Sequence, residues 1–452
     1  MFTVLLSGGS GKRLWPLSND LRSKQYIKLL PYEYDSGVRC SMVQRVWAQL
    51  SDAGMTSSSV ICASSGQLEM IHSQLGNVPI AIEPDRRDTF PAIALSCAYL
   101  VDAMGAKEND VVCIMPVDPF VESSYYQSIK EIDDVLQESS ADIALLGAKP
   151  TYPSEKYGYI VPGTHYQGYF SVEKFLEKPQ LEIAQDLINQ GAFWNCGVFC
   201  FRIKILIEKL LHYGLALNYE ELYANYDKLP KISFDYEVLE KTTNIVVVPY
   251  EGVWKDLGTW NTLTEEMVGY TFGKAHISNA CKNTHVINEL NIPIVTLGVN
   301  DMVVVASFDG ILVADKRESS NIKDVIQDIK ERPMYEERRW GTIKTLDCSE
   351  RPNATTLTKK VTIFAGMSSS YHYHELYDEI WAVLRGKAEL IIDGDHRQME
   401  EGSSIQISKG QKHAVKAIEE FEYIEIHLGE TSGEVDMNRI TFDWQEIASL
   451  GK

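Results

Sequence analysis

The sequence predicts an α/β protein made of a doubly wound sheet domain, a small β-rich segment and a C-terminal β-barrel. In the first half of the chain, short apolar runs alternate with amphipathic stretches, and in the last quarter alternating strands surround closely spaced histidines. A chain of 452 residues is also too long for one ordinary core. We therefore expect three domains, which cover residues 1–270, 271–334 and 335–452.

Composition restricts the functional classes. With 44% hydrophobic residues the chain is expected to be globular. Its formal charge of −20, without a basic stripe, argues against a nucleic-acid partner. The chain starts without a basic leader, and no run approaches the roughly 18 apolar residues of a membrane span. We therefore expect a cytoplasmic protein. The eight cysteines lack Cys-x-x-Cys spacing and are expected to be buried thiols.

A glycine-rich loop follows the apolar run Phe2–Leu6, which is expected to form a buried strand. The loop, Ser7–Gly11, can adopt unusual backbone angles and present its amides to an anion. Three cations come after the glycines: Lys12, Arg13 and Lys24. A polyphosphate lying on the amides would meet all three cations. The stretch therefore predicts a nucleotide site.

Two other known glycine-containing loops, the phosphate-binding Walker A loop and the nucleophile elbow, do not fit this spacing. A Walker A loop needs a glycine where Leu6 stands and a serine or threonine where Arg13 stands. A nucleophile elbow needs its last glycine where Lys12 stands, so Ser10 is not a hydrolase nucleophile. A plain glycine-rich turn is the remaining alternative, and the cations beside the loop argue against it.

The run from Leu6 to Ser18, with Ser23-Lys24-Gln25, resembles the signature of sugar-1-phosphate nucleotidylyltransferases. It is most similar to the mannose-1-phosphate guanylyltransferases that carry a C-terminal cupin of the phosphomannose isomerase type. That family usually has Thr or Gly where Lys12 stands and Pro where Ser23 stands. The resemblance implies that the nucleotide contacts Gly8, Gly9, Gly11, Lys12 and Arg13.

The rest of the first half shows the alternation of a doubly wound sheet. The expected strands are Val60–Ala63, Pro79–Ile82, Val111–Met115 and Ile143–Leu146. The expected helices include Thr89–Asp102 and Ser124–Leu136. Ligands of such sheets bind at the carboxyl ends of the strands, so the residues just past each run are candidate site residues.

The segment from Glu83 to Ala92 follows one of these runs and resembles the family's segment near the nucleotide base. The Glu83 carboxylate can accept from N1–H and N2–H of guanine, a pair of donors that cytosine and thymine lack. Guanine is therefore the favoured base, and Arg87 is the second nucleotide-binding candidate here. Asp88 and Phe90 depart from the family, and a surface ion pair between Arg87 and Asp88 is the alternative.

Two aspartates are expected to bind Mg²⁺. Asp118 follows an expected strand in the family's Pro-x-Asp motif, with Pro119 in place of the family's His. Asp256 lies in Trp254-x-Asp-x-Gly-x-Trp260, which matches a second family motif. Two carboxylates and phosphate oxygens form the oxygen-rich shell that Mg²⁺ prefers. A helix cap is the alternative for Asp118.

Three motifs in the middle of the chain follow the family's order: Lys156-Tyr-Gly158-Tyr-Ile160, Phe175-Leu-Glu177-Lys178-Pro179 and Trp194-Asn195-Cys-Gly197. The resemblance implies that Gly158 and Asn195 lie against the sugar. It also implies that Glu177 accepts sugar hydroxyls and that Lys178 binds the sugar phosphate, which suits both side chains. By itself an adjacent Glu-Lys pair would indicate plain surface. Asp235 is expected to be an N-terminal helix residue and not a catalyst.

No residue is expected to form a covalent intermediate. The phosphate oxygen of the sugar 1-phosphate can attack the α-phosphorus in line while pyrophosphate leaves. Catalysis would then rest on positioning and on neutralisation of charge, to which Mg²⁺ and Lys178 contribute. The expected catalytic residues are Arg13, Lys24, Asp118 and Asp256.

The β-rich segment is predicted to be a packing module without chemistry and resembles the family's linker region. Its expected strands are Val286–Asn288, Ile292–Gly298, Met302–Ala306 and Ile311–Ala314, and a helix is expected over 320–330. Glu331-Arg-Pro333 and Arg339-Trp340-Gly341 resemble the family's entry into the final domain. They indicate a boundary near residue 335.

The last domain is predicted to be a cupin barrel with a metal site. Its expected strands are Leu357–Phe364, Ile380–Ile392, Gly402–Ser408, His413–Ile418 and Tyr423–Leu428. The spacing from Gly366 to Gly386 fits the first cupin motif, and the spacing from Gly402 to His413 fits the second, with Ser408 in place of the usual Pro. One divalent transition metal, Zn, Mn, Co or Fe, is therefore expected on His372, His374, Glu379 and His413. A chance His-x-His is the alternative.

The chain departs from the isomerase-bearing family beside these ligands. It reads His374-Glu-Leu-Tyr-Asp-Glu379 where the family has His-Arg-Ala-Glu-His, and no Arg follows His413. Phosphomannose isomerisation needs a cation for the sugar phosphate, so we expect weak isomerase activity or none. The closing segment with Glu434, Asp436 and Arg439 still resembles the family, and Arg439 is the candidate cation.

The motifs and the resemblance together predict a Mg²⁺-dependent enzyme of polysaccharide biosynthesis that joins GTP and mannose 1-phosphate into GDP-mannose and pyrophosphate. One alternative is a transferase for another sugar 1-phosphate or nucleotide, such as CTP, because Glu177 and Asn195 would suit several hexoses. The other is a non-catalytic sugar-nucleotide sensor, which would not need a pair of metal-binding aspartates. The expected partners are a nucleoside triphosphate and a sugar 1-phosphate, with no membrane partner and a homodimer as the assembly to test.

Overall fold

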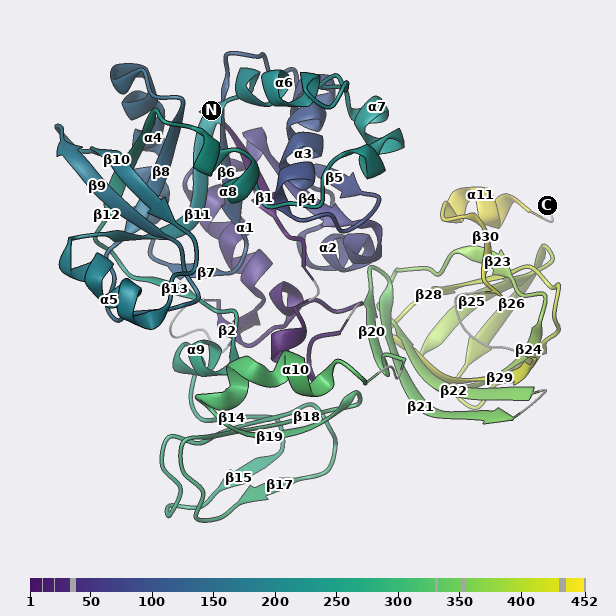
Figure 1. The fold of residues 1–452 in the computed structure, drawn as a ribbon. Helices are drawn as coiled ribbons and strands as arrows, with labels where there is room; N and C mark the ends of the chain where they lie inside the picture. Colours follow the sequence, from purple (N-terminus) through teal and green to yellow (C-terminus); the bar gives the residue numbers. More distant parts are fainter. Residues whose placement is uncertain are drawn as a thin grey trace. The chain divides into compact units, whose positions relative to one another are not determined.

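The computed structural model describes residues 1–9, 11–19, 21–32, 38–329, 332–351, 354–430 and 436–450. The motif residues Ser10, Glu331 and Glu434 lie outside this set. Unit 1, the first of two compact units (Figure 1), comprises Met1–Leu14, Ser23–Leu68 and Leu75–Gly269. Unit 2 comprises Trp15–Arg22, Glu69–Gln74 and Tyr270–Lys452. Because unit 2 joins the expected β-rich segment to the expected barrel, the division into three domains stays a prediction.

Unit 1 is built on a nine-stranded sheet with the order β5-β4-β1-β6-β11-β8-β12-β10-β9. Its strands are β1 (Phe2–Leu6), β4 (Ser59–Ser64), β5 (Ile80–Glu83), β6 (Val111–Pro116), β8 (Ile143–Ala148), β9 (Tyr159–His165), β10 (Phe170–Leu176), β11 (Phe193–Arg202) and β12 (Ile245–Tyr250). The first four pair in parallel, whereas β11 runs antiparallel between β6 and β8. The expected strands are confirmed, in a sheet that is mixed and not wholly parallel.

Two short strand pairs complete the β structure of unit 1. One joins β2 (Leu30–Pro31) to β3 (Arg39–Cys40). The other joins β7 (Pro119–Val121) to β13 (Trp254–Asp256), with Asp256 opposite Pro119. The second pair matters for function because it brings the two predicted metal-binding motifs together across one antiparallel ladder.

The helices described in the first 269 residues are α1 (Met42–Asp52), α2 (Leu68–Leu75), α3 (Thr89–Met104), α4 (Ser124–Ser139), α5 (Leu181–Asn189), α6 (Lys204–Leu211), α7 (Tyr219–Ala224), α8 (Phe234–Glu237) and α9 (Trp260–Glu265). Among them, α3 and α4 match the two expected amphipathic stretches, Thr89–Asp102 and Ser124–Leu136. Asp88 caps α3 by accepting a hydrogen bond from Thr89 N at 2.8 Å, which satisfies one of the free amides at the helix start.

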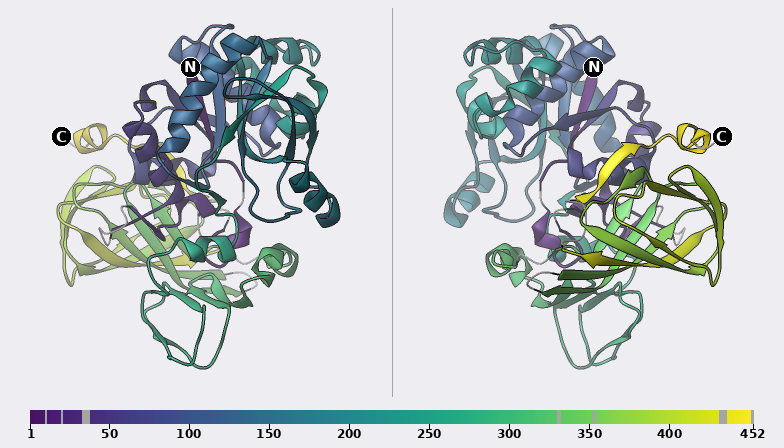
Figure 2. Two further views of the ribbon diagram at one scale, coloured as in Figure 1. Left: turned by 90° about the vertical axis from the view of Figure 1, so that its left-hand side faces the viewer. Right: turned by 90° about the vertical axis from the view of Figure 1, so that its right-hand side faces the viewer.

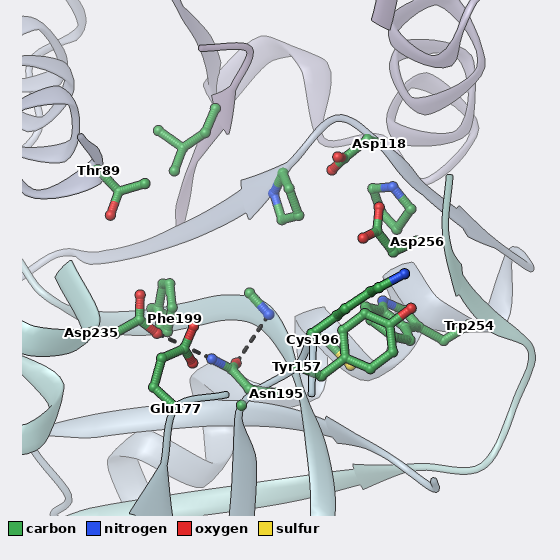
Figure 3. Close-up of a pocket in the computed structure, with 16 residues that line it drawn as sticks. Thr89, Asp118, Tyr157, Glu177, Asn195, Cys196, Phe199, Asp235, Trp254 and Asp256 are labelled. Carbon is green, nitrogen blue, oxygen red and sulfur yellow. Dashed lines mark hydrogen bonds between the residues drawn. The ribbon is translucent and has the colours of Figure 1, made fainter. Parts of the chain in front are cut away.

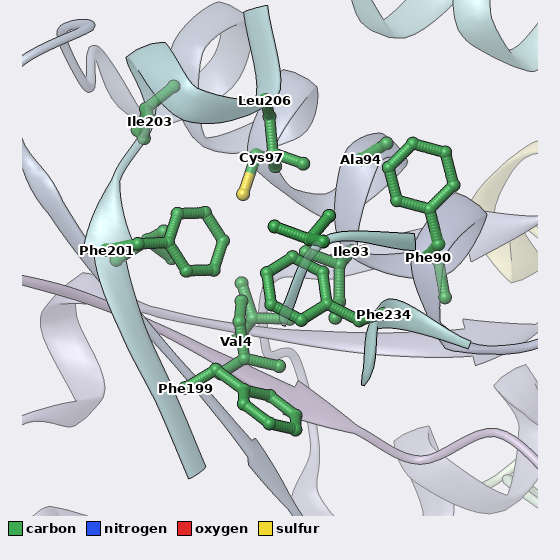
Figure 4. Packing of buried hydrophobic residues seen from close by; sticks show 14 of the residues in the cluster. Val4, Phe90, Ile93, Ala94, Cys97, Phe199, Phe201, Ile203, Leu206 and Phe234 are labelled. Carbon is green, nitrogen blue, oxygen red and sulfur yellow. The ribbon is translucent and has the colours of Figure 1, made fainter. Parts of the chain in front are cut away.

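A buried cluster of α3 and sheet residues forms the core of unit 1 (Figure 4). Phe234 packs between Phe199 and Phe201, with ring centroids 5.2 and 5.1 Å away. Aromatic contacts of this kind add to the free energy gained by burying apolar area. Because Phe234 opens the short helix α8, this packing fixes the position of the next residue, Asp235, at the edge of the sheet.

The β-rich part of unit 2 contains two small sheets with the orders β14-β16-β18-β19 and β15-β17. The elements are β14 (Thr271–Phe272), β15 (Ala275–Ile277), β16 (His285–Asn288), β17 (Ile294–Thr296), β18 (Met302–Ser307), β19 (Gly310–Asp315) and α10 (Ile322–Ile326). The expected helix over 320–330 was too long. A short 3₁₀ helix leads into α10, which ends at Ile326, and the next apolar residue, Ile329, is 43% exposed and gains little from a longer helix.

The remaining strands of unit 2 close into a barrel (Figure 2) made of two sheets with the orders β20-β21-β22-β29-β24-β27 and β26-β25-β28-β23-β30. Its elements are β20 (Tyr335–Arg338), β21 (Gly341–Arg351), β22 (Ala354–Ile363), β23 (Tyr371–Tyr373), β24 (Tyr377–Arg385), β25 (Lys387–Ile392), β26 (Asp395–Glu400), β27 (Ser404–Ile407), β28 (His413–Ala417), β29 (Phe421–Gly429), β30 (Asn438–Thr441) and α11 (Trp444–Ser449).

One expected barrel strand was wrong. Ile380–Ile392 is not a single strand, because a turn at Gly386 separates β24 from β25 and sends them into different sheets. The other expected barrel strands are confirmed within a few residues.

All eight cysteines carry free thiols, and six of them are buried as expected, while Cys281 and Cys348 are partly exposed. Among the described residues, no helix is both long enough and apolar enough to span a membrane.

Candidate active site and candidate metal centre

Unit 1 contains a cavity of about 240 Å³ at one edge of its sheet (Figure 3). The carboxyl ends of β6 and β10 lie at this edge. The starts of β9 and β11 lie there too, because β9 runs antiparallel to β10 and β11 runs antiparallel to β6. Asp118 and Asp256 lie on one side of the cavity, and Glu177, Asn195 and Asp235 lie on the other. The predicted site residues that line it are Asp118, Gly158, Glu177, Asn195 and Asp256.

The positive charge of Lys24 acts on both Asp118 and Asp256. Leu257 N donates to Asp118 O at 3.3 Å, next to the β7–β13 pair, so the two carboxylates are neighbours. Lys24 Nζ forms an ion pair with Asp118 Oδ2. Burial alone would lower the pKa of Lys24, but Asp118 and Asp256 together outweigh burial and raise it. Lys24 therefore stays charged beside the aspartates.

The neutralisation of this carboxylate pair is incomplete. Burial and the Asp118 charge raise the pKa of Asp256, while Lys24 and Arg13 act in the opposite direction. Asp256 Oδ1 is buried and has no hydrogen-bond partner among the described residues. A buried polar oxygen without a partner costs free energy. The donor set, two carboxylates with one unsatisfied oxygen, thus fits a hard divalent cation.

The glycine-rich loop lies against Lys24. Gly11 has a φ of +60°, and a Cβ atom there would lie 2.4 Å from Lys24 N, so only glycine allows this approach. Lys12 and Arg13 are exposed in the 3₁₀ turn that follows. A second hollow of about 250 Å³ borders the loop and is lined by residues that include Gly8, Gly9, Glu83 and Arg87. The structure thereby brings the predicted phosphate loop and the predicted base segment together.

Glu83 and Arg87 are both held by residues that sequence reasoning did not select. Tyr226 donates to Glu83 Oε1 at 2.7 Å, and the carboxylate is buried. Burial raises the pKa of Glu83, and the Tyr226 hydroxyl acts in the opposite direction. Arg87 donates to Leu229 O through Nε at 3.1 Å and Nη2 at 2.9 Å, and its Nη1 lies 3.8 Å from Asp85 Oδ2. Asp88 caps α3 instead of pairing with Arg87.

Asn195 organises the sugar side of the cavity (Figure 3). Its backbone N donates to Gly158 O at 2.8 Å, and its side-chain amide donates to Asp235 Oδ1 at 3.2 Å. Glu177 Oε1 pairs with Lys178 Nζ at 2.5 Å, although the Lys178 side chain is 60% exposed. Lys178 thus lies at the rim while Glu177 and Asn195 form the wall.

Asp235 is the residue of this site that sequence reasoning underestimated. It lies in the first turn of α8, as expected, but its side chain also lines the cavity. Burial, and secondarily the Glu177 carboxylate, raise the pKa of Asp235 to about 7. The aromatic rings of Tyr157 and Trp254 lie 5.3 Å apart on the cavity wall and were also missed. The sequence does contain a signal for these two rings, because they stand close to Gly158 and Asp256 in the motifs.

In the barrel, the predicted histidines His372, His374 and His413 converge. Their ligand nitrogens lie within 4.8 Å of one another, and all three side chains are buried. Each Nδ1 bonds to a backbone carbonyl: Ser370 O at 2.8 Å, Asp436 O at 3.0 Å and Gln411 O at 3.0 Å. Since Nδ1 then carries the proton, each Nε2 keeps a lone pair for a metal.

Glu379 completes the predicted set. Its carboxylate lies 3.0 Å from His374 Nε2 and 3.4 Å from His413 Nε2. Burial, and secondarily the charge of His413, lower the pKa of His372 to about 3, which keeps that imidazole neutral. Three imidazoles and one carboxylate form a donor set that fits a divalent transition metal.

A second buried group lies beside these ligands and was missed. Glu425 Oε1 lies 2.5 Å from His427 Nε2 and 3.4 Å from Lys359 Nζ, and His427 Nε2 lies 3.5 Å from Glu379 Oε1. The alternation of buried and partly exposed residues along β29 puts Glu425 and His427 on one face, which was the available signal. Arg439, the cation suggested by sequence, is exposed on β30.

A mixed α/β sheet with a carboxylate-lined cavity at one edge, next to a glycine-rich loop, is the arrangement expected of a nucleotide-transferring enzyme, and in this chain a β-barrel follows it. Residues 2–271 match the family described as nucleotidyl transferase, and residues 360–427 match the cupin domain. The chain therefore belongs to the nucleotidyl transferase family, and the resemblance found in the motifs is confirmed.

Named relatives cover nearly the whole chain. A mannose-1-phosphate guanylyltransferase of Escherichia coli (strain K12) is 30% identical over 92% of both chains. A xanthan biosynthesis protein, XanB, of Xanthomonas campestris pv. campestris (strain B100) is 30% identical over 96% of this chain and 97% of its own. A crystal structure from Thermus thermophilus, described as a mannose-1-phosphate geranyltransferase, is 26% identical with a TM-score of 0.60 over 73% of this chain and 99% of its own.

Proposed function

We propose that this enzyme transfers a GMP group from GTP to mannose 1-phosphate, which gives GDP-mannose and pyrophosphate. One observation carries the proposal: motifs far apart in the sequence meet around one cavity that Asp118 and Asp256 line, and Lys24 forms an ion pair with Asp118. The names of the relatives that match nearly the full chain support guanine and mannose. A sensor would gain nothing from a buried carboxylate pair that lacks full neutralisation.

The glycine-rich loop would hold the nucleotide. In this proposal the amides of Gly8, Gly9 and Gly11 receive the phosphates, and Lys12 and Arg13 add charge at the exposed side of the loop. Glu83 would accept from the guanine edge, with Tyr226 fixing one of its oxygens. Arg87 would hold the base segment in place through Leu229 O.

The opposite wall would hold the sugar. Glu177 and Asn195 would bond sugar hydroxyls beside Gly158, and Lys178 at the rim would receive the sugar phosphate. Asp235 would orient the Asn195 amide through its hydrogen bond. The wall of Tyr157 and Trp254 would limit access of water to the reacting phosphates.

Asp118 and Asp256 would hold Mg²⁺, because their oxygens and the unsatisfied Asp256 Oδ1 fit a small hard cation. When bound, Mg²⁺ supplies Lewis-acid neutralisation of the charge that develops on the phosphate oxygens. In the barrel, His372, His374, Glu379 and His413 would hold one Zn, Mn, Co or Fe ion.

The reaction needs no covalent intermediate on the protein. A deprotonated phosphate oxygen of mannose 1-phosphate attacks the α-phosphorus of GTP in line, and the bond from that phosphorus to the pyrophosphate oxygen breaks. Arg13 and Lys24 neutralise the leaving pyrophosphate, and the pocket walls align the two substrates. The three-domain division at 271 and 335, a cytoplasmic location and a homodimer stay predictions.

A substrate panel tests the proposed function. Purified protein with Mg²⁺ is given each of ATP, CTP, GTP and UTP with mannose, glucose and galactose 1-phosphates, and pyrophosphate release is measured. The expected result is fastest turnover with GTP and mannose 1-phosphate. Preference for CTP or UTP would overturn the base assignment, and tight binding without pyrophosphate release would favour the sensor.

A further inference from the structure

The signature stretch is divided between the two units. Gly11–Leu14 and Ser23–Lys24 belong to unit 1, whereas the residues between them, Trp15–Arg22, belong to unit 2. We call Trp15–Arg22 the signature segment. Its two ends lead directly to the predicted catalytic cations, because Arg13 and Lys24 each lie two residues away from it.

Side chains of the β-rich linker bind the signature segment. Ser307 Oγ donates to Pro16 O at 2.8 Å. Asn19 Nδ2 donates to Asp309 Oδ2 at 2.6 Å. Both linker residues lie at the β18–β19 turn, and Asp309 is fixed in turn by Met334 N, which donates to its Oδ1 at 2.5 Å. Hydrogen bonds in partly buried positions of this kind hold a loop in one geometry.

A buried ion pair adds to these contacts. Arg22 Nη1 lies 2.9 and 3.0 Å from the two carboxylate oxygens of Glu289, and its guanidinium stacks 5.0 Å from the Tyr335 ring centroid. Burial would lower the pKa of Arg22, but Glu289 outweighs burial and raises it. Breaking such a pair leaves a buried charge without compensation.

The segment also fits the linker closely in shape. A Cβ atom at Gly310 would lie 2.5 Å from Trp15 Cζ2, so the start of β19 lies directly against the indole ring. Within the segment, Asn19 Oδ1 accepts from Leu21 N at 2.8 Å and from Arg22 N at 2.7 Å. The segment is therefore braced internally as well as from the linker.

We infer that the β-rich linker positions the catalytic cations of the transferase site, through Glu289, Ser307 and Asp309. These residues act on Arg13 and Lys24 by fixing the segment that joins them, so they are positioning residues and touch no substrate. The inference rests on the proposed function for the identity of the reaction. It also gives the linker a positioning role in addition to the packing role that the sequence predicts.

A swap of the Asn19–Asp309 pair tests the inference. Asn19→Asp places two carboxylates against each other, whereas the double variant Asn19→Asp/Asp309→Asn restores one donor and one acceptor. Ser307→Ala and Ser319→Ala form a matched pair, because Ser319 Oγ also donates to a backbone carbonyl, Lys316 O at 2.6 Å, but away from the segment.

For each variant, kcat, KM, the Kd of GTP and the melting temperature are measured on the full chain. Misplaced catalytic groups lower kcat by about 10-fold to 100-fold. We expect a loss in that range for Asn19→Asp, a smaller one for Ser307→Ala, rescue in the double swap and parent values for Ser319→Ala. The inference is overturned by a folded Asn19→Asp variant with parent kcat and parent GTP affinity, or by a double swap that regains the melting temperature but not kcat.

Failure of the proposed function gives a different result. If the parent enzyme released no pyrophosphate with any substrate pair, the proposed function would fail, while GTP binding in the same variants would still report on the positions of Arg13 and Lys24. Weaker GTP binding in Asn19→Asp, restored in the double swap, then supports the inference, and unchanged GTP binding overturns it.

Discussion

The ammonium group of Lys24 forms an ion pair with Asp118 beside the buried carboxylate of Asp256. In the proposed reaction Asp118 and Asp256 would hold a divalent cation, and such a cation and the Lys24 ammonium would both be attracted to the same two carboxylates. A cation held there would therefore weaken the ion pair between Lys24 and Asp118 and leave more of the Lys24 charge for the phosphates.

Replacement of Lys24 should move metal affinity and turnover in opposite directions. In Lys24→Met, the aspartates lose their competing cation, so Mg²⁺ or Mn²⁺ without nucleotide should bind several-fold more tightly, as titration calorimetry would show. Turnover should fall by about 100-fold or more, because a charge that stabilises the transition state is lost. Lys174→Met, on exposed β10, serves as the control. Unchanged metal affinity would show that Lys24 does not compete.

Asp256→Ala should abolish turnover and leave the fold intact. The substitution deletes a proposed metal ligand and not a core side chain, and Lewis-acid catalysis would contribute several kcal/mol. Pyrophosphate release should fall by about 1,000-fold or more while circular dichroism is unchanged. Asp395→Ala, at an exposed position of β26, is the control. Near-normal activity of Asp256→Ala with Mg²⁺ would refute the two-aspartate scheme.

The sequence was sufficient for local motifs and insufficient for what tertiary packing adds to them. Asp118 follows an expected strand, so the topology rule for open sheets pointed to the edge where the cavity lies. Glu177, Asn195 and Asp256 came from the family motifs, and they line the same cavity. Asp235 was underestimated, because its entry into the cavity depends on Phe234 packing against β11.

The same limit applies to the fold of unit 2. The sequence predicts one strand, Ile380–Ile392, across Gly386, because hydrophobic alternation continues on both sides of the turn. This alternation does not reveal that the chain changes from one sheet to the other. The role of Trp15–Arg22 could not be predicted either, because its partners Glu289 and Asp309 lie more than two hundred residues away in sequence. Long-range pairing of this kind has no local signal.

Glu83→Gln should selectively weaken the use of GTP. One acceptor oxygen becomes a donor that faces the guanine N–H groups, which costs about 1–3 kcal/mol, so kcat/KM for GTP should fall by about 5-fold to 150-fold. Discrimination against ATP should shrink at the same time. Tyr226→Phe, which removes the hydroxyl that donates to Glu83, should produce a smaller loss in the same direction. A uniform loss across all four nucleotides would contradict a role in reading the base.

Stability should depend on pH through Asp235. Burial, and then Glu177, raise its pKa from an ordinary 3.8 to about 7, so between these values the folded chain holds a proton that the unfolded chain has lost. The stability contribution is full below about pH 4 and is lost as pH rises to about 7. Asp235→Asn removes this loss.

The melting temperature of Asp235→Asn should therefore exceed that of the parent by more at pH 8 than at pH 5, with a change in free energy of at most about 3 kcal/mol between the two. Asp395→Asn, exposed on β26, should show no such trend. A difference between Asp235→Asn and the parent that is the same at both pH values would show that the carboxyl group does not titrate in this range.

The last prediction concerns the barrel, where metal binding and isomerase activity should separate. In our proposal metal affinity should depend on His372, His374, Glu379 and His413, and the Nδ1 atoms of the three histidines are anchored on backbone carbonyls. Isomerisation of mannose 6-phosphate also needs a phosphate anchor. Arg439 is exposed, and Lys359, a buried cation near the ligands, already pairs with Glu425.

We therefore expect about one divalent metal ion per chain in the parent and almost none in His374→Ala, as measured by mass spectrometry of metal content. His396→Ala, which replaces an exposed histidine, is the control and should keep the metal content of the parent. Interconversion of mannose 6-phosphate and fructose 6-phosphate should be slow or absent in all three, even with added Zn²⁺, Mn²⁺ or Co²⁺, because loss of phosphate anchoring costs several kcal/mol of orientation. Rapid isomerisation that disappears in His374→Ala would show the opposite. Lys359→Met and Arg439→Met would then identify which cation anchors the phosphate in a bifunctional enzyme.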